Sequence, residues 1–184
     1  MLNFAYQEHV RSYYFDSRNQ DFQFPPLTQI EHADVCVIGA GFFGLSAALE
    51  LAEKGKKVIV LEGARVGFGA SGRSGGQAIN GFEEGIDEYV KQIGEDKAHK
   101  LWNMSLETID IIDERIEKYS IQCDWKKGYA TLALNERRMD DLIEMEKESH
   151  KNFGYQNMQL WDKTKLKQHL GSDIYVGGLF EDRK

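Results

Sequence analysis

The chain has 184 residues, of which 41% are hydrophobic and 29% are charged, and its formal net charge at pH 7 is −7. This length is typical of one domain, or of one domain with part of another, and the apolar share excludes a disordered chain. The acidic balance argues against nucleic acid as a partner, because binding to nucleic acid depends on Lys and Arg neutralising phosphates.

Neither a signal peptide nor a membrane span is recognisable in the sequence. The start lacks a basic segment followed by an apolar one, and no run reaches the ~18 apolar residues that suggest a membrane helix. The two cysteines, Cys36 and Cys123, have no zinc or C-x-x-C spacing, so we predict no metal site. We therefore expect a cytoplasmic protein in which Cys36 is a small buried side chain.

Residues 1–33 are polar and rich in aromatic side chains. Pro25 and Pro26 disfavour a helix there, so we expect an extended amino-terminal arm. We further expect the aromatic side chains to anchor this arm to the surface of the domain. They are Tyr13, Tyr14, Phe15, Phe22 and Phe24.

The next segment has the pattern of a strand, a helix and a second strand. Val35–Ile38 and Val58–Leu61 are continuous apolar runs, which are typical of parallel strands buried on both faces. Between them, apolar residues recur at helical spacing, and Gly55 is placed to end the helix in the left-handed conformation. This apolar stripe consists of Leu45, Ala48, Leu49 and Ala52.

Three glycines between the first strand and the helix have the spacing G-x-G-x-x-G. They are Gly39, Gly41 and Gly44. Such glycines allow a tight turn, a close approach of the backbone to a pyrophosphate, and close packing of the helix on the sheet. Backbone N–H groups at the helix start, around Phe42 and Phe43, would face the phosphates. Glu62 would accept hydrogen bonds from ribose hydroxyls and repel a 2′-phosphate, which disfavours NADP but leaves FAD and NAD open.

A second glycine-rich segment, residues 63–85, follows Glu62. Ser71 could donate to a phosphate or ribityl oxygen, Arg73 could balance phosphate charge, and Gly75 and Gly76 would let the backbone approach an isoalloxazine ring. Simple nicotinamide domains usually continue with another helix here, so the segment favours FAD, although a mobile lid or a connector also fits. The predicted cofactor contacts in this segment are Ala70, Ser71, Arg73, Ser74, Gly75, Gly76 and Gln77.

The remaining residues predict a mixture of helices and strands. A long amphipathic helix begins at Glu95 and has one apolar face. That face consists of Ala98, Trp102, Ser105, Ile109, Ile112 and Ile116. Residues 123–134 resemble a β-hairpin with a turn at 126–128. Asn135 is placed to cap a second helix that ends near Gly154. That helix would pack through Met139, Leu142 and Ile143, followed by a strand near 158–161, a helix over 164–170 and a strand at 175–180.

The run of residues 61–77 resembles the amino-terminal signature of FAD-dependent amine oxidoreductases of the D-amino-acid oxidase type. Within that superfamily it is most similar to the gamma-glutamylputrescine oxidoreductases. Residues 12–14, 121–124 and 175–178 also fit this family, so the resemblance covers nearly the whole chain.

The resemblance implies an α/β fold: a Rossmann-like FAD/NAD(P)-binding domain with the beginning of a second, α+β substrate domain. It also implies FAD as the cofactor and a small-molecule amine, such as gamma-glutamylputrescine, as the substrate in polyamine catabolism. A hydride would pass from the amine to flavin N5, the imine would hydrolyse to an aldehyde and ammonia, and oxygen would be reduced to peroxide. Because the flavin supplies this chemistry, the catalytic residues stay unassigned.

We expect three regions: the arm (1–33), an FAD-binding core with its glycine-rich loop (34–94), and the helices and first strands of an incomplete substrate region (95–184). Family members are longer, so the resemblance implies an amino-terminal fragment without the carboxy-terminal part needed for turnover. Because the partner strands are then missing, we expect the isolated chain to expose apolar sheet surface and so to self-associate or bind FAD weakly, with a complementary carboxy-terminal fragment as the other expected partner. Two alternatives stay open. The chain could be a non-catalytic remnant or interaction module that keeps the fold, or a fragment of an NAD-linked dehydrogenase.

Overall fold

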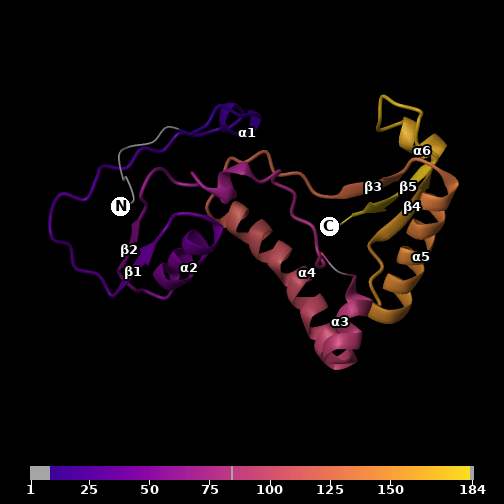
Figure 1. The fold of residues 1–184 in the computed structure, drawn as a ribbon, viewed down its shortest axis with the longest axis horizontal. Coiled ribbons are helices and arrows are strands. Elements are labelled where there is room, and N and C mark those ends of the chain that lie inside the picture. Colours follow the sequence, from indigo (N-terminus) through magenta and orange to yellow (C-terminus); the bar gives the residue numbers. More distant parts are fainter. Residues whose placement is uncertain (1–8, 84, 183–184) are drawn as a thin grey trace. The chain divides into compact units, whose positions relative to one another are not determined.

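The computed structural model describes residues 9–83 and 85–182 (Figure 1). The first eight residues of the predicted arm lie outside the described residues, as do positions 84, 183 and 184 in the other two predicted regions. The chain divides into two compact units. The first contains the described residues up to 83 together with 105–123, and the second contains 85–104 and 124–182.

The first unit is built on the predicted βαβ motif. Strands β1 (Val35–Ile38) and β2 (Val58–Leu61) pair in parallel, with Val35 opposite Val58 and Ile38 opposite Leu61. Helix α2 (Phe42–Glu53) connects them and packs on both strands. Gly55 follows α2 with φ +78°, so the predicted left-handed helix stop is confirmed.

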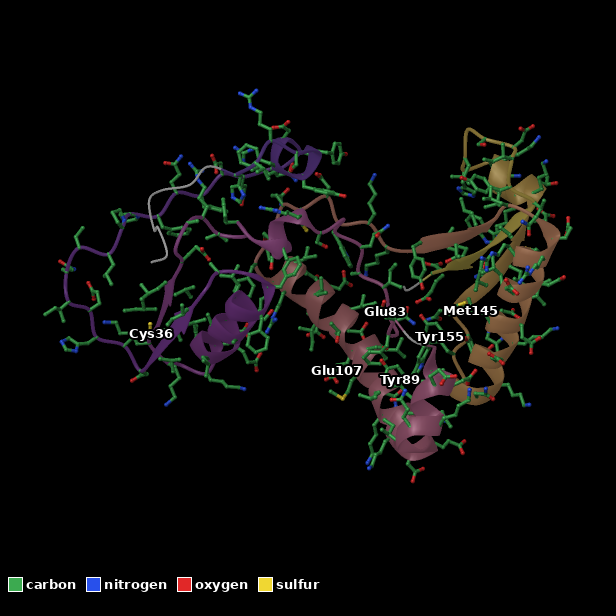
Figure 2. All side chains as sticks on the ribbon, in the orientation of Figure 1. Cys36, Glu83, Tyr89, Glu107, Met145 and Tyr155 are labelled. Atoms are coloured by element: carbon green, nitrogen blue, oxygen red, sulfur yellow. The ribbon has the colours of Figure 1, made fainter. Side chains whose placement is uncertain are left out.

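The prediction that β1 is buried on both faces is wrong. Val35 and Val37 are half-buried beneath α2, but Cys36 is exposed and the Ile38 side chain is 87% exposed. Successive side chains of a strand point to opposite faces, and α2 covers the face that carries Val37. The expected burial of Cys36, which Figure 2 labels on this strand, is therefore also wrong.

The contact face of α2 differs in part from the predicted apolar stripe. Ala48 is buried as predicted, but Leu45 and Ala52 are exposed, whereas Ala47 and Leu51 are half-buried. Apolar residues occur around most of this helix, so helical spacing alone does not select one face. The contact with the sheet selects it instead.

Helix α4 (Glu95–Lys118) has the predicted amphipathic face. Ala98, Trp102, Ser105 and Ile109 are buried along it. The helix is shared between the units, and its second half is joined to α2 by an ion pair of 2.9 Å between Arg115 Nη2 and Glu50 Oε2. Among the described residues, none of the helices combines the length and apolar composition that crossing a membrane would require.

The arm contains a short helix in place of a fully extended chain. Helix α1 (Tyr13–Asp16) is capped by Ser12, whose Oγ accepts a hydrogen bond of 3.2 Å from Phe15 N. The expected anchoring by aromatic side chains is mostly wrong, because Tyr13 and Phe24 are more than two thirds exposed. Phe15 is the half-buried member of the predicted set.

The second unit contains a three-stranded antiparallel sheet in the order β3-β5-β4 (Figure 1). Its strands are β3 (Tyr129–Ala133), β4 (Met158–Asp162) and β5 (Gly177–Glu181). The predicted hairpin is wrong, because residues 123–125 form no strand and β3 pairs with β5 instead. Asp124 and Gly128 have φ values of +54° and +83°, which interrupt an extended chain before β3.

Most of the other helices and strands of this unit lie where the sequence predicts them. Asn135 caps α5 (Glu136–Phe153) by accepting a hydrogen bond of 3.0 Å from Arg138 N, and Gly154 ends it at φ +62°. Helix α6 (Lys163–Lys167) and strands β4 and β5 lie within a few residues of their predicted positions. Helix α3 (Ile86–Ile93), which has only about two turns, was not predicted.

A buried carboxylate joins three segments of the second unit. Glu181 at the end of β5 is 2% exposed and accepts hydrogen bonds from the hydroxyls of Tyr129, at 2.8 Å, and Tyr155. Tyr155 is labelled in Figure 2. These hydrogen bonds offset the cost of removing a charged group from water. Burial, with the nearby Glu181 carboxylate as the second cause, raises the pKa of Tyr129 above its usual value.

This raised pKa predicts a specific loss of stability at alkaline pH. In the unfolded chain Tyr129 ionises near pH ~10, whereas in the folded chain it stays protonated to higher pH. The contribution of Tyr129 to the free energy of unfolding is therefore complete below pH ~10, and it is lost as the pH rises from the pKa of the unfolded chain toward that of the folded chain. Compared with the wild-type protein, Tyr129→Phe should have a lower midpoint temperature of thermal unfolding near neutral pH. Above pH ~10, however, the midpoint temperature of the variant should fall less steeply as the pH rises. Parallel curves for the two proteins would contradict this assignment.

Candidate cofactor site

The turn between β1 and α2 leaves room for backbone only. Gly39 has φ +99°, and its N–H donates a hydrogen bond of 2.7 Å to Leu61 O at the end of β2. A Cβ on Gly44 would lie 2.0 Å from Gly39 O and 3.3 Å from Val37 Cγ1. Real Cβ atoms do not approach so closely, so Gly44 lets α2 begin directly against β1. The structure therefore shows the turn and helix-packing roles predicted for these two glycines.

The first turn of α2 begins at a residue without a capping side chain. Gly41 is the N-cap residue and has no side chain that could satisfy the free N–H groups. The side chains of Phe42 and Phe43 are 64% and 90% exposed. Phe42 N donates a hydrogen bond of 2.9 Å to Ser71 Oγ, which brings the second glycine-rich segment to the helix start.

The carboxylate of Glu62 lies just beyond β2 and reaches back to this turn. Its Oε2 accepts a hydrogen bond of 2.8 Å from Ala40 N, and its Oε1 accepts one of 3.0 Å from Ala64 N. The two bonds hold the carboxylate beside the turn that follows β1. Each carboxylate oxygen has a second lone pair with which it could accept a ribose hydroxyl. The ribose contact itself stays a prediction.

The loop after Glu62 is folded closely against the turn. Gly67 N donates a hydrogen bond of 3.0 Å to Ala40 O, and a Cβ on Gly72 would lie 2.1 Å from Gly67 O. A 3₁₀ helix, η1 (Ala70–Arg73), then carries Ser71. A Cβ on Gly41 would lie 2.8 Å from Ser71 Oγ, so this glycine allows the loop to approach.

The structure thus brings together part of the predicted set. The residues that meet at the helix start are Gly39, Gly41, Phe42, Gly44, Glu62 and Ser71. Ala70 and Arg73 lie on η1 beside Ser71, with Arg73 exposed. Ser74, Gly75, Gly76 and Gln77 follow η1, and Ser74 Oγ accepts a local hydrogen bond of 3.3 Å from Gly76 N. Their contact with a flavin ring stays a prediction.

Two residues of this site were not predicted from the sequence. Ala40 is 2% exposed and uses both its N–H and its carbonyl, bonding Glu62 and Gly67. Ala64 supplies the second N–H to Glu62. Both act through backbone atoms, so their side chains carry little signal. For Ala40, the one signal in the sequence is that a small residue stands between two glycines of the motif.

Comparison with known proteins agrees with this geometry. Residues 34–184 match the family described as FAD dependent oxidoreductase, and the chain belongs to that family. It is 98% identical over 181 residues to a protein of Haemophilus influenzae named probable oxidoreductase OrdL. It is also 42% identical over 174 residues to gamma-glutamylputrescine oxidoreductase of Escherichia coli. These alignments cover 98% and 95% of this chain but 42% and 41% of the relatives.

Solved structures show the same fold. L-amino acid deaminase from Proteus vulgaris, in a form without its specific insertion sequence, superimposes with a TM-score of 0.60 over 88% of this chain and 40% of its own, at 23% identity. Glycine oxidase from Geobacillus kaustophilus does so with a TM-score of 0.57 over 82% and 39%, at 21% identity. The predicted α/β fold class is therefore confirmed.

The family assignment makes FAD the cofactor and decides between FAD and NAD, which the glycine motif had left open. The residues present fit such a group. Gly41 leaves the N-cap position without a side chain, the N–H groups of the first helical turn would favour an anion there, and Glu62 is held beside the turn. The chain spans about two fifths of the length of the curated relatives that it matches.

The close contact at Gly44 predicts a large effect of one methyl group. Gly44→Ala should lower the free energy of unfolding by about 2 kcal/mol or more, because the new Cβ meets backbone that has no room to move. Chemical denaturation followed by circular dichroism measures this loss. Gly69→Ala is the control, since a Cβ there would meet nothing within 4 Å. Equal stability of the two variants would contradict the packing argument.

Proposed function

We propose that this chain forms the ADP-binding part of an FAD-dependent oxidoreductase that oxidises a C–N bond of a small amine with oxygen as the acceptor. The observation that carries the proposal is the junction of the two glycine segments, where Ser71 Oγ accepts the hydrogen bond from Phe42 N. At this junction a helix start, a hydroxyl and the Glu62 carboxylate surround one turn of backbone. Such an arrangement suits a pyrophosphate followed by a ribose.

Each residue has a definite part in this proposal. Phe42 N donates to Ser71 Oγ, so the other N–H groups in the first turn of α2 donate to the pyrophosphate, and the helix dipole favours its charge. Ser71 accepts from Phe42 N with its oxygen, so its own hydrogen is free to be donated to a phosphate oxygen. Arg73 on η1 adds positive charge beside these donors. FAD bound beside these residues would supply the redox chemistry for oxidising the amine with oxygen as the acceptor.

The proposed substrate is an amine like gamma-glutamylputrescine, which would place the protein in polyamine catabolism. Its support is the 42% identity to the Escherichia coli relative that is named for this activity. The proposal keeps residues 34–94 as the FAD-binding core and assigns 95–184 to the substrate region, with 1–33 as the arm. Cytoplasmic location belongs to the same proposal. The free thiols of Cys36 and Cys123 suit a reducing compartment.

FAD binding tests the cofactor site directly. The purified protein should show flavin absorbance bands, and Glu62→Gln should weaken FAD binding by about tenfold, since a hydrogen-bonded charged group typically contributes ~1.5 kcal/mol or more. Glu107→Gln removes an exposed carboxylate from α4, labelled in Figure 2, and is the matched control. Equal FAD affinity of the Glu62 variant and its control would remove Glu62 from the site.

Turnover tests the substrate and separates an enzyme from a remnant. The protein loaded with FAD should release peroxide when it is supplied with gamma-glutamylputrescine. It should release peroxide more slowly with putrescine, because putrescine lacks the glutamyl group. Peroxide from neither amine, despite stoichiometric FAD, would favour the alternative of a non-catalytic module with this fold. A preference for an unrelated amine would retain the cofactor proposal and correct the substrate.

The exposed face of β1 supports the expected association of this chain with itself or with a complementary carboxy-terminal fragment. Ile38 is 87% exposed on that face and lies near the exposed Cys36 in sequence. Exposed apolar sheet surface favours association. Sedimentation of the chain should show larger species as concentration rises, and Ile38→Glu should shift the distribution toward monomer. A chain that stays monomeric at every concentration would contradict self-association.

A further inference from the structure

The segment between η1 and α3 is held to α4 by a backbone hydrogen bond. Residues 74–83 form neither helix nor strand. Within this segment, Gly81 N donates a hydrogen bond of 3.0 Å to Oγ of Ser105 on α4. Both residues belong to the first unit. The hydroxyl of Ser105 therefore fixes the position and the direction of one N–H group in the segment.

Ser105 is well placed to hold this N–H group. It is 9% exposed and belongs to the buried face of α4 that also contains Trp102 and Ile109. A side chain that is packed on a helix face has little freedom to follow a moving loop. An opening of the segment therefore breaks the hydrogen bond, and closing restores it.

The residue before Gly81 is Asn80, the only asparagine in the sequence that precedes a glycine. The side-chain amide of an asparagine can be attacked by the backbone nitrogen of the next residue. Glycine favours this attack because it has no Cβ to hinder it and has the widest backbone freedom. Gly81 has φ +97°, a conformation that other residues rarely adopt. A reactive amide thus stands next to an attacking nitrogen whose proton is donated to Ser105.

The hydrogen bond to Ser105 opposes this attack in two ways. To react, Gly81 N must lose its proton and approach Cγ of Asn80. Donation to Ser105 Oγ favours the protonated form of the nitrogen and directs its N–H toward α4. The attack therefore has to wait for a local opening in which the contact with Ser105 is broken.

We propose that Asn80 is a deamidation site and that the hydrogen bond from Gly81 N to Ser105 Oγ keeps the reaction slow in the folded protein. In the reaction, Gly81 N forms a bond to Asn80 Cγ, and the bond from Cγ to the side-chain nitrogen breaks. Ammonia leaves with the proton from Gly81 N. Water then opens the resulting succinimide at either of its carbonyls, which gives aspartate or isoaspartate. No oxidant or reductant takes part.

Both products would alter the segment that follows the predicted flavin contacts. Each adds a negative charge at position 80, and isoaspartate also inserts a methylene group into the backbone. Residues 74–77 lie just before this change in the sequence. The inference does not depend on the proposed function, because the reaction needs only water and this chain.

The first experiment compares the rate of deamidation in the folded and the unfolded protein. Wild-type protein is incubated at mildly alkaline pH with and without guanidinium chloride, and peptide mapping by mass spectrometry follows the conversion of Asn80 to aspartate and isoaspartate. Conversion in the folded protein should be at least ~10-fold slower, because only the locally opened state reacts. Equal rates in the two states, or no conversion in the unfolded chain, would overturn the proposal. This experiment needs no variant, so it does not depend on how any variant folds.

The second experiment removes the acceptor. In Ser105→Ala the folded protein should convert Asn80 about fivefold faster than wild type, because losing a hydrogen bond raises the population of the open state by roughly this factor. Amide hydrogen exchange at Gly81 should become faster by a similar factor. Ser149→Ala removes a buried serine hydroxyl from α5, in the other unit, and is the control. An unchanged rate in Ser105→Ala, or an equal increase in Ser149→Ala, would overturn the role of Ser105.

Replacing the reacting side chain tests the route of the reaction. Asn80→Gln lengthens this side chain by a methylene group, so that cyclisation has to form a larger ring and becomes slow. When Asn80→Gln is added to Ser105→Ala, deamidation at position 80 should disappear, while amide exchange at Gly81 should stay fast. Deamidation at position 80 that continues at the same rate would overturn the attack by Gly81 N.

Discussion

The absence of a side chain at Gly44 is the constraint on which the candidate cofactor site depends. Any Cβ there would lie 2.0 Å from the carbonyl oxygen of Gly39, so only glycine allows α2 to start directly against the end of β1. This close start fixes where the first N–H groups of the helix lie. It also fixes the turn at Ala40, whose N–H and carbonyl then bond Glu62 and Gly67. The close approach of Gly44 to Gly39 thus fixes the backbone positions at the start of α2 and at the Ala40 turn, which together form the site.

The sequence predicts the βαβ unit well because local rules determine it. The apolar runs Val35–Ile38 and Val58–Leu61 correspond to β1 and β2 residue for residue. Asn135 and Gly154 mark both ends of α5, since capping acts between residues a few positions apart. The amphipathic face of α4 is likewise visible in its spacing. In each case the physical cause lies within a short stretch of chain.

Predictions that depended on distant residues were less reliable. The partner of β3 is β5, almost fifty residues further on, and the turn residues before β3 resemble those of a hairpin. The exposure of Cys36 depends on which faces of a strand are covered, and an apolar run alone does not show this. In the site, Glu62 and Ser71 could be named from the sequence. Their meeting with Ala40 N and Phe42 N follows from the folded turn.

The glycine-rich loop is not uniformly permissive, although its composition suggests flexibility. A Cβ on Gly72 would lie 2.1 Å from Gly67 O, whereas a Cβ on Gly69 or Gly85 would meet nothing within 4 Å. Two surfaces of this loop contact other segments, one toward the start of α2 and one toward the arm.

The local distribution of charge also differs from what the overall composition suggests. The chain carries a net charge of −7, yet Arg18, Arg65 and Arg73 line one pocket beside this loop, and Asp21 is the only acidic residue among the described residues of that lining. Positive charge is thus concentrated locally within an acidic protein, and because electrostatic attraction is screened beyond ~10 Å, such local charge acts on a nearby anion more strongly than the net charge does.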